Sequence, residues 1–338
     1  MTDVANAIVL LLNFVIVPGV AYGSQLALGA LGVTLIFGIL RFANFAHGDV
    51  MAFGTMVVLL TTWWFQGMGV GIAPLPTALI ALPFGIVGAA AFNLAADRVV
   101  FRFYRRRKSP PVILLIASVG VMFALQGIVR FIIGPDDRRL ADGARFIIKA
   151  SEFKAATGLK EGLAIKLSQG LTLGVAAIAV AALFWFLHRT RAGKAMRAYS
   201  DNEDLALLSG VSPDRVVFYA WLIAGTLAAV AGTMYGIDKS YKPFTYFQLL
   251  LPIFASAILG GIGHPIGAVA GGFIVALSET AVTYAYKKFL RYLVPESWEP
   301  SGLMQLLSTD YKLAISFVIL VVVLLVRPTG IFRGRVLS

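Results

Sequence analysis

Ionisable side chains within apolar stretches are the first candidates for chemistry in this sequence, and they are few. Glu279 lies inside an apolar run at 266–286, and His47 lies where the run at 49–66 begins. A charge in the middle of a bilayer costs about 2.5–3.5 kcal/mol, so we expect Glu279 to face other helices or to be protonated. A single histidine without a ligand cluster is more typical of packing or capping than of a proton relay or a metal site.

The motifs of common enzyme classes are missing. The chain has no cysteine, which removes disulfides, thiolate catalysis and sulfur-ligated metals. Gly193-Lys194 is followed by Ala195 and lacks the upstream glycine of a phosphate loop. No G-x-S-x-G elbow or H-E-x-x-H pair is present. We therefore expect no catalytic residue, no metal site and no cofactor in this chain; if it moves a solute with ATP, another chain must bind the nucleotide.

A polar segment at 189–214 separates two apolar runs and has the pattern of a short surface helix. The N-cap is expected at Ser200 or Asp201, and two acidic residues follow in the first turn, where the helix dipole favours negative charge. Gly210 is a suitable stop. The small apolar face consists of Leu205, Ala206 and Leu208. Such a helix can dock into a groove on a partner protein or lie on lipid, and its acidic first turn favours the partner.

Two further segments carry helix-breaking and packing signals. Residues 32–49 end one apolar run and begin the next; Asn44 and Asp49 can cap helix ends, and Gly48 suits the turn. In the second segment, 260–272, glycines recur every four residues and predict one smooth helix face that permits close packing in lipid. These glycines are Gly263, Gly267 and Gly271. The preceding Gly260 and Gly261 would also permit a broken helix beside a polar path, although simple close packing explains the pattern.

Membrane-spanning helices must position all of these residues. Hydrophobic residues make up 59% of the 338-residue chain, charged residues 14%, and the mean hydropathy is +0.83, whereas soluble domains carry about 25% charged residues. Runs near the length of a bilayer span must be helical, because lipid offers their backbone no hydrogen-bond partners. The runs are 8–39, 49–66, 74–97, 111–133, 170–187, 216–236, 247–261, 266–286 and 311–327. We expect an all-α polytopic protein of about nine spans. Eight to ten remain possible, because Pro18-Gly19 interrupts the long first run and the short seventh run is either a full span or re-entrant.

Basic clusters predict the orientation of one transmembrane domain covering 1–338. Six Lys and Arg residues fall in 98–108, four more in 189–197, and the C-terminal group is Arg327, Arg333 and Arg335. With nine spans all three clusters lie on one side, which the positive-inside rule assigns to the cytoplasm. The N-terminus and the 134–169 loop are then outside, and the 189–214 loop and the C-terminus are cytoplasmic. The formal net charge of +12 reflects loops beside anionic lipid headgroups rather than a nucleic-acid partner.

Four segments in this order resemble the branched-chain amino acid permease family of ABC importers, and specifically its LivH-like subunit. The first joins Gly38-Ile39-Leu40-Arg41 to Asn44-Phe45-Ala46-His47-Gly48, and the second is the 193–211 loop. The third joins Ile258-Leu259-Gly260-Gly261-Ile262-Gly263 to Gly271-Gly272, and the last is Arg327-Pro328-Thr329-Gly330-Ile331-Phe332. Each segment alone is weak, whereas the ordered set spans nearly the whole chain.

The resemblance implies a complex in the bacterial inner membrane. Its other members would be a second, homologous permease subunit, two cytoplasmic ATP-binding subunits and an extracytoplasmic substrate-binding protein. The 193–211 loop would be the coupling segment seated on an ATPase, through Gly193, Arg197, Ala198, Asp201, Asn202, Glu203, Ala206, Gly210 and Val211. Residues expected in the translocation path or in helix packing are Asn44, His47, Gly48, Gly260, Gly261, Gly263, Gly267, Gly271 and Glu279. The 134–169 loop is longer than we expect of the family and is predicted to contact the binding protein.

The substrate and the energy source have alternatives at this point. Urea and short-chain amide permeases share the family pattern, so the cargo is a branched-chain or related small amino acid, or such an amide. An ion-coupled secondary transporter with Glu279 as its coupling carboxylate is a rival of another class. A membrane enzyme or scaffold has no supporting constellation of residues.

Overall fold

The computed structural model describes residues 2–140, 142–294 and 302–332. Within these residues nine helices are long and apolar enough to cross a bilayer, which confirms the predicted all-α polytopic class with nine spans. They are Thr2–Leu40, His47–Gly67, Ala78–Arg106, Pro111–Ile133, Leu167–Arg189, Pro213–Asp238, Pro243–Gly260, Pro265–Val282 and Thr309–Val326. Arg333 and Arg335, two of the predicted C-terminal basic residues, lie outside the described residues.

The first span is continuous and has a local defect before its proline. It consists of α1 (Thr2–Leu11), a π-helical turn (Leu12–Ile16) and α2 (Val17–Leu40). Pro18 follows this turn directly and has no N–H with which to continue the helical hydrogen bonds. The wider turn accommodates the proline without splitting the helix, so Pro18-Gly19 does not divide the first run into two spans.

The centre of the bundle is formed by the most buried spans. α2 packs against α11 (Pro213–Asp238) and α13 (Pro265–Val282), with α3 (His47–Gly67) and α12 (Pro243–Gly260) beside them. α15 (Lys312–Val326) is far more exposed. Small residues dominate the central contacts: Gly272 meets the backbone of Ala27 in α2. Because lipid is as apolar as these side chains, close backbone approach and dispersion hold such helices together.

The third span continues through the basic segment. α4 (Ala78–Ala96) is followed by a π-helical turn (Asp97–Phe101) and α5 (Arg102–Arg106). The expected basic loop at 98–108 is therefore helical as far as Arg106. A π-helical turn, a feature often found at functional sites, rotates the side chains of α5 about the helix axis relative to those of α4. α6 (Pro111–Ile133) then returns across the bundle.

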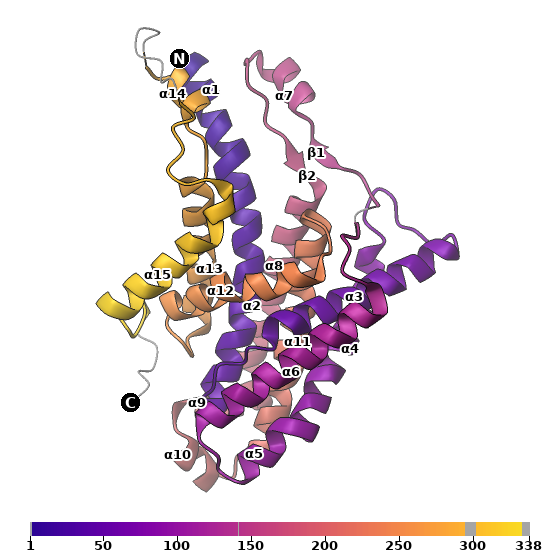
Figure 1. Cartoon of the computed structure of the whole chain (residues 1–338), viewed down its shortest axis with the longest axis vertical. Helices are drawn as coiled ribbons and strands as arrows, with labels where there is room; N and C mark the ends of the chain where they lie inside the picture. The colour runs from indigo at the N-terminus through magenta and orange to yellow at the C-terminus, as the bar shows by residue number, and fades with distance from the viewer. Residues whose placement is uncertain (1, 141, 295–301, 333–338) are drawn as a thin grey trace.

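The polar segments gather at two opposite ends of the molecule (Figure 1). α5, α9 (Arg191–Asp201) and α10 (Glu203–Leu208) lie at one end. The N-terminus, α7 (Ala150–Thr157) and α14 (Lys287–Arg291) lie at the other. The basic segment and the predicted docking loop thus share one end, as the sequence predicts.

The 134–169 segment contains regular structure. Strands β1 (Phe146–Ile148) and β2 (Ile165–Lys166) pair antiparallel around α7, and α8 (Leu167–Arg189) follows. Glu161 fixes this segment to α14 and its end: its carboxylate accepts hydrogen bonds from Lys288 Nζ at 2.9 Å and Tyr292 Oη at 2.7 Å. Its backbone N–H donates to Asn6 Oδ1 at 3.0 Å. Burial disfavours the charged carboxylate, but these bonds and the charge of Lys288 outweigh burial and hold the pKa of Glu161 below its usual value.

Candidate functional site

The 189–214 segment folds into two helices that turn tightly against α8. Thr190 caps α9, since its Oγ1 accepts a hydrogen bond from the Gly193 N–H at 3.0 Å. A Cβ at Gly193 would lie 2.2 Å from the Phe186 carbonyl oxygen, so only glycine permits this approach. Met196 and Tyr199 are buried, whereas Arg197 and Ala198 are exposed. α9 is thus anchored on one side and open on the other.

Helix α10 begins one or two residues later than predicted. Asn202, rather than Ser200 or Asp201, is its N-cap, because the Asn202 backbone is extended and its Oδ1 accepts from Leu205 N–H at 3.1 Å. α9 continues through Ser200 and Asp201 and leaves neither free to act as the cap. The two acidic residues at 203 and 204 do occupy the first turn.

The end of α10 is a Schellman motif centred on Gly210. Gly210 has φ +81°. Its N–H donates to the Leu207 carbonyl, and the Val211 N–H donates to the Ala206 carbonyl, both at 3.0 Å. Val211 also packs against the buried cluster that contains Ala206. These are the two capping bonds and the apolar contact of the motif, which requires a left-handed residue at Gly210.

The apolar residues of α10 point in two directions. Ala206 is buried, whereas Leu205 is 61% exposed and Leu208 is 85% exposed. A polar pocket of about 370 Å³ lies beside them, lined by Arg41, Asp201, Asn202, Glu203 and Asp204. Exposed leucines therefore lie next to an acidic turn on this part of the surface.

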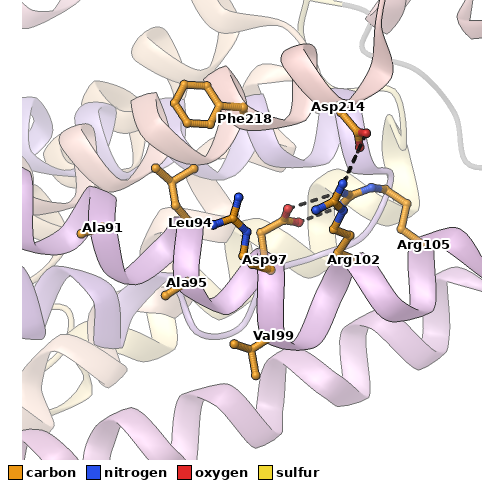
Figure 2. Close-up of a pocket in the computed structure, with 10 residues that line it drawn as sticks. Ala91, Leu94, Ala95, Asp97, Val99, Arg102, Arg105, Asp214 and Phe218 are labelled. Atoms are coloured by element: carbon orange, nitrogen blue, oxygen red, sulfur yellow. Dashed lines mark hydrogen bonds and ion pairs between the residues drawn. The ribbon is translucent and has the colours of Figure 1, made fainter.

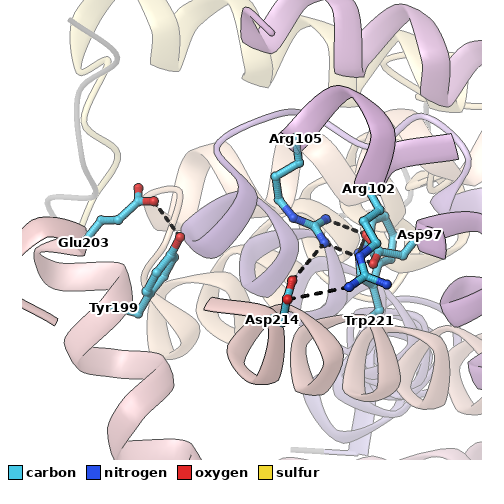
Figure 3. Close-up of polar contacts among 7 residues, drawn as sticks. All are labelled: Asp97, Arg102, Arg105, Tyr199, Glu203, Asp214 and Trp221. Atoms are coloured by element: carbon cyan, nitrogen blue, oxygen red, sulfur yellow. Dashed lines mark hydrogen bonds and ion pairs between the residues drawn. The ribbon is translucent and has the colours of Figure 1, made fainter. Parts of the chain in front are cut away.

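A hydrogen bond joins α9 to α10 (Figure 3), and a cluster of buried rings lies between α9 and the spans. Tyr199 Oη donates to Glu203 Oε1 at 2.6 Å. Burial and this acceptor raise the pKa of Tyr199. Tyr199 belongs to a buried cluster in which Phe101 stacks on Trp221 with a centroid distance of 5.0 Å. α9 contacts α2 and α11, and the cluster also includes Phe101 of the third span.

Asp97 links the third span to α11 within the same region. Arg105 donates to both Asp97 oxygens, at 2.6 and 3.2 Å, and Trp221 Nε1 donates to Oδ1 at 2.8 Å. The sequence analysis missed Asp97, Arg105 and Trp221. An Asp and an Arg eight positions apart on a basic helix are a weak signal, and only the fold brings Trp221 to them.

After the exposed Arg41, the 42–49 segment is largely buried and turns at Phe45-Ala46, so Gly48 lies in α3 and its predicted place in the turn is wrong. Asp49 does not cap α3; its Oδ2 accepts from Gln126 Nε2 at 3.2 Å. Asn44 is buried, and its Oδ1 accepts from Ala46 N–H at 3.2 Å to shape the start of α3. His47 is fully buried; a Cβ at Gly32 would lie 2.5 Å from its Cε1. Neither ring nitrogen forms a hydrogen bond of standard geometry. Gly48 lies against the backbone of Tyr246, where a Cβ would come within 2.6 Å of the carbonyl oxygen.

The glycines at 260–272 form a turn and a packing contact, not one stripe. α12 ends at Gly260, and Gly261 and Gly263 have φ +101° and +86°. Gly263 therefore lies in the turn before α13, and its predicted place on a helix face with Gly267 and Gly271 is wrong. His264 caps α13, since its Nδ1 accepts from Gly267 N–H at 3.1 Å.

Close backbone contact joins α12 and α13 beyond this turn. A Cβ at Gly267 would lie 2.1 Å from the Gly260 carbonyl oxygen, and one at Gly271 would lie 2.0 Å from that of Ser256. These separations leave no room for any side chain. Gly260, Gly267 and Gly271 thus occupy packing positions between the two helices.

Glu279 is paired rather than open to a path. It is fully buried, with Lys312 Nζ 3.5 Å from its Oε2 and Ser316 Oγ donating to its Oε1. Lys312 Nζ also lies 3.8 Å from the centre of the Tyr22 ring. The carboxylate therefore joins α13 to α15, a span with few other buried residues.

Comparison with known proteins identifies the family of this arrangement. Residues 15–324 match the family model described as branched-chain amino acid transport system / permease component. The chain belongs to this permease family. Its relatives include the high-affinity branched-chain amino acid transport system permease protein LivH of Salmonella typhimurium, 34% identical over 94% of each chain, and LivH of Escherichia coli K12, 33% identical over the same shares. BraD of Pseudomonas aeruginosa is 28% identical over 95% of each chain.

Among solved structures, PsaBC from Streptococcus pneumoniae in complex with Fab is similar with a TM-score of 0.46 and 13% identity, covering 97% of this chain and 93% of that one. Membership of the permease family, with full-length coverage by its relatives, makes the chain a permease subunit of an ABC importer and a multi-pass membrane protein. It is a transport subunit, not an enzyme.

Proposed function

We propose that this permease passes leucine, isoleucine, valine or a related small amino acid from an extracytoplasmic binding protein to the cytoplasm. The identity of the substrate is supported by the similarity to branched-chain amino acid permeases along almost the whole chain. A second, homologous permease subunit would complete the translocation path. The N-terminus would lie outside and the C-terminus in the cytoplasm, as the shared end of α5, α9 and α10 supports.

Helices α9 and α10 would couple ATP hydrolysis to transport by binding to one of two cytoplasmic ATP-binding subunits. Leu205 and Leu208 would enter a groove of that subunit, and the acidic first turn of α10 would face basic residues there. Movement of α10 would reach α2 and α11 through the Tyr199–Trp221 cluster and switch access to the path.

Site-specific cross-linking tests the docking assignment directly, because the natural chain has no cysteine. Leu208→Cys in the assembled importer should cross-link to the ATP-binding subunit through a short thiol-reactive linker. Leu303→Cys is the matched control: Leu303 is also largely exposed, at 65%, but its carbonyl accepts from Lys287 of α14 at the opposite end. Cross-linking from Leu303→Cys and not from Leu208→Cys would reject the docking surface.

Ligand binding to the co-purified receptor tests the cargo. Labelled leucine should bind and be displaced by isoleucine and valine. Displacement by urea or acetamide but not by valine would reject the amino-acid assignment and favour an amide permease.

A further inference from the structure

A groove separate from the docking surface lies where the third span meets α11. It has a volume of about 510 Å³ and lies between the end of α4, the π-helical turn and the start of α11. Figure 2 shows Ala91, Leu94, Ala95 and Phe218 at one end, and Arg102, Arg105 and Asp214 at the other. The groove is thus apolar along the span and polar where the span ends.

The apolar end of the groove is open at the outer surface of the described bundle. Val99 is 78% exposed and Phe218 is 45% exposed, and Ala91 and Ala95 are also exposed. Within a nine-span membrane protein, exposed apolar residues on a spanning helix face hydrocarbon or another subunit. Where this face meets hydrocarbon, a chain-like apolar ligand has direct access to the groove from the bilayer.

The basic end retains positive charge after its internal ion pairs are counted. Arg105 is occupied by both oxygens of Asp97. Arg102 has only a long contact to Asp214, 3.7 Å from its guanidinium nitrogen, and its Nε is buried without an acceptor. Arg98 is exposed and makes no hydrogen bond or ion pair with any residue in the described part of the chain.

The two arginines that are not bonded to Asp97 lie four residues apart on the third span. Arg98 lies within the π-helical turn and Arg102 begins α5. Residues four apart lie on neighbouring parts of one helix face, and both side chains line the groove. Two guanidinium groups at one mouth suit a phosphate, whose oxygens accept from arginine in a planar, two-bonded geometry.

The geometry points to a site for an anionic phospholipid in this groove: Arg98 and Arg102 hold the phosphate, and an acyl chain lies along Ala95, Val99 and Phe218. An apolar channel leading to a basic mouth at the end of a span matches the two halves of such a lipid. Because the site touches the Asp97–Arg105–Trp221 contacts, a bound lipid would stabilise the junction between the third span and α11.

Native mass spectrometry of the full-length chain in a neutral detergent tests this site. Phosphatidylglycerol and phosphatidylcholine with identical acyl chains are the probes, and the bound fraction is the readout. The chain should retain phosphatidylglycerol preferentially. Loss of each arginine should weaken binding about fivefold, so Arg98→Gln with Arg102→Gln together should weaken it about 25-fold.

The matched control is Arg106→Gln with Lys108→Gln. It removes the same charge from the same segment at two exposed residues that do not line the groove, so it should leave retention nearly unchanged. Ala95→Phe keeps both arginines and fills the apolar end, so it should also lower retention, and elution volume and thermal unfolding verify that each variant is folded.

Three outcomes would overturn the site. They are equal retention of the two lipids, equal loss in the arginine pair and its control, and displacement of the lipid by millimolar inorganic phosphate with no effect of Ala95→Phe. The last outcome would show a free-anion site.

Discussion

Gly210 offers the sharpest perturbation of the proposed coupling helix. Its φ of +81° is required by the two capping bonds that end α10. A Cβ added there would meet nothing within 4 Å, so Gly210→Ala introduces backbone strain without any clash. The strain therefore falls on the end of α10.

The expected size of the Gly210→Ala effect follows from the backbone conformation at this position. An L-residue in the left-handed region is disfavoured by roughly 1–2 kcal/mol, which corresponds to a shift of about 5–30-fold in the population of the correctly ended helix. Gly210→Pro is more severe, because proline fixes φ near −65° and removes the N–H that bonds to Leu207. Gly210→Asn should be the mildest, since asparagine tolerates this conformation.

Uptake and ATP hydrolysis by the assembled importer in liposomes measure the effect. Membrane level should stay normal, while uptake falls in the order Asn, Ala, Pro and hydrolysis no longer responds to loaded binding protein. Gly69→Ala is the matched control: Gly69 follows the end of α3 with φ +75°, the same pair of capping bonds and equally open surroundings, so it carries the same strain outside α10. Normal coupled uptake by Gly210→Pro, or an equal loss in Gly69→Ala, would refute the reasoning.

Three further predictions concern the frame that supports the site. Lys312→Met should lower the free energy of unfolding by an amount toward the lower end of about 3–5 kcal/mol, because it leaves Glu279 buried without its cation. Glu279→Gln combined with Lys312→Met should regain most of this loss in thermal unfolding, and an undiminished loss in the double variant would contradict the pairing. Gly271→Ala should lower the free energy of unfolding by at least about 1–3 kcal/mol and reduce the folded yield, since its Cβ would lie 2.0 Å from the Ser256 carbonyl oxygen. Gly174→Ala, which has open surroundings in α8, should leave stability and yield unchanged. Because the folded-state pKa of Glu161 is depressed, its contribution to stability is present above the unfolded pKa of about 4.3 and is lost as pH falls through the folded pKa. Glu161→Gln should therefore be less stable at pH 7 and lose less further stability between pH 5 and pH 3. An unchanged acid response would count against the Lys288 contact.

The spans were predictable because their cause is local. An uncharged run of bilayer length must form a helix, and Pro111–Ile133 begins and ends at the predicted residues. The acidic first turn of α10 and its stop at Gly210 follow equally from capping chemistry.

The wrong predictions come from local turns and caps with alternative positions, whereas the missed residues depend on contacts between distant segments. Gly263 has the spacing of a packing stripe, but the turn after Gly261 removes it from the helix. Lys312, 33 positions after Glu279, becomes its partner only when α15 packs against α13. The groove at Arg98 and Arg102 forms where the third span meets α11, a contact that composition does not reveal.

Reconstitution of leucine uptake tests the central claim most directly. The full-length chain alone in liposomes, under an imposed proton or sodium gradient, should accumulate no leucine. The same chain assembled with the second permease, the ATP-binding subunits and the loaded binding protein should accumulate it only when ATP is present on the side of α9 and α10. Accumulation by the isolated chain under an ion gradient would contradict the account.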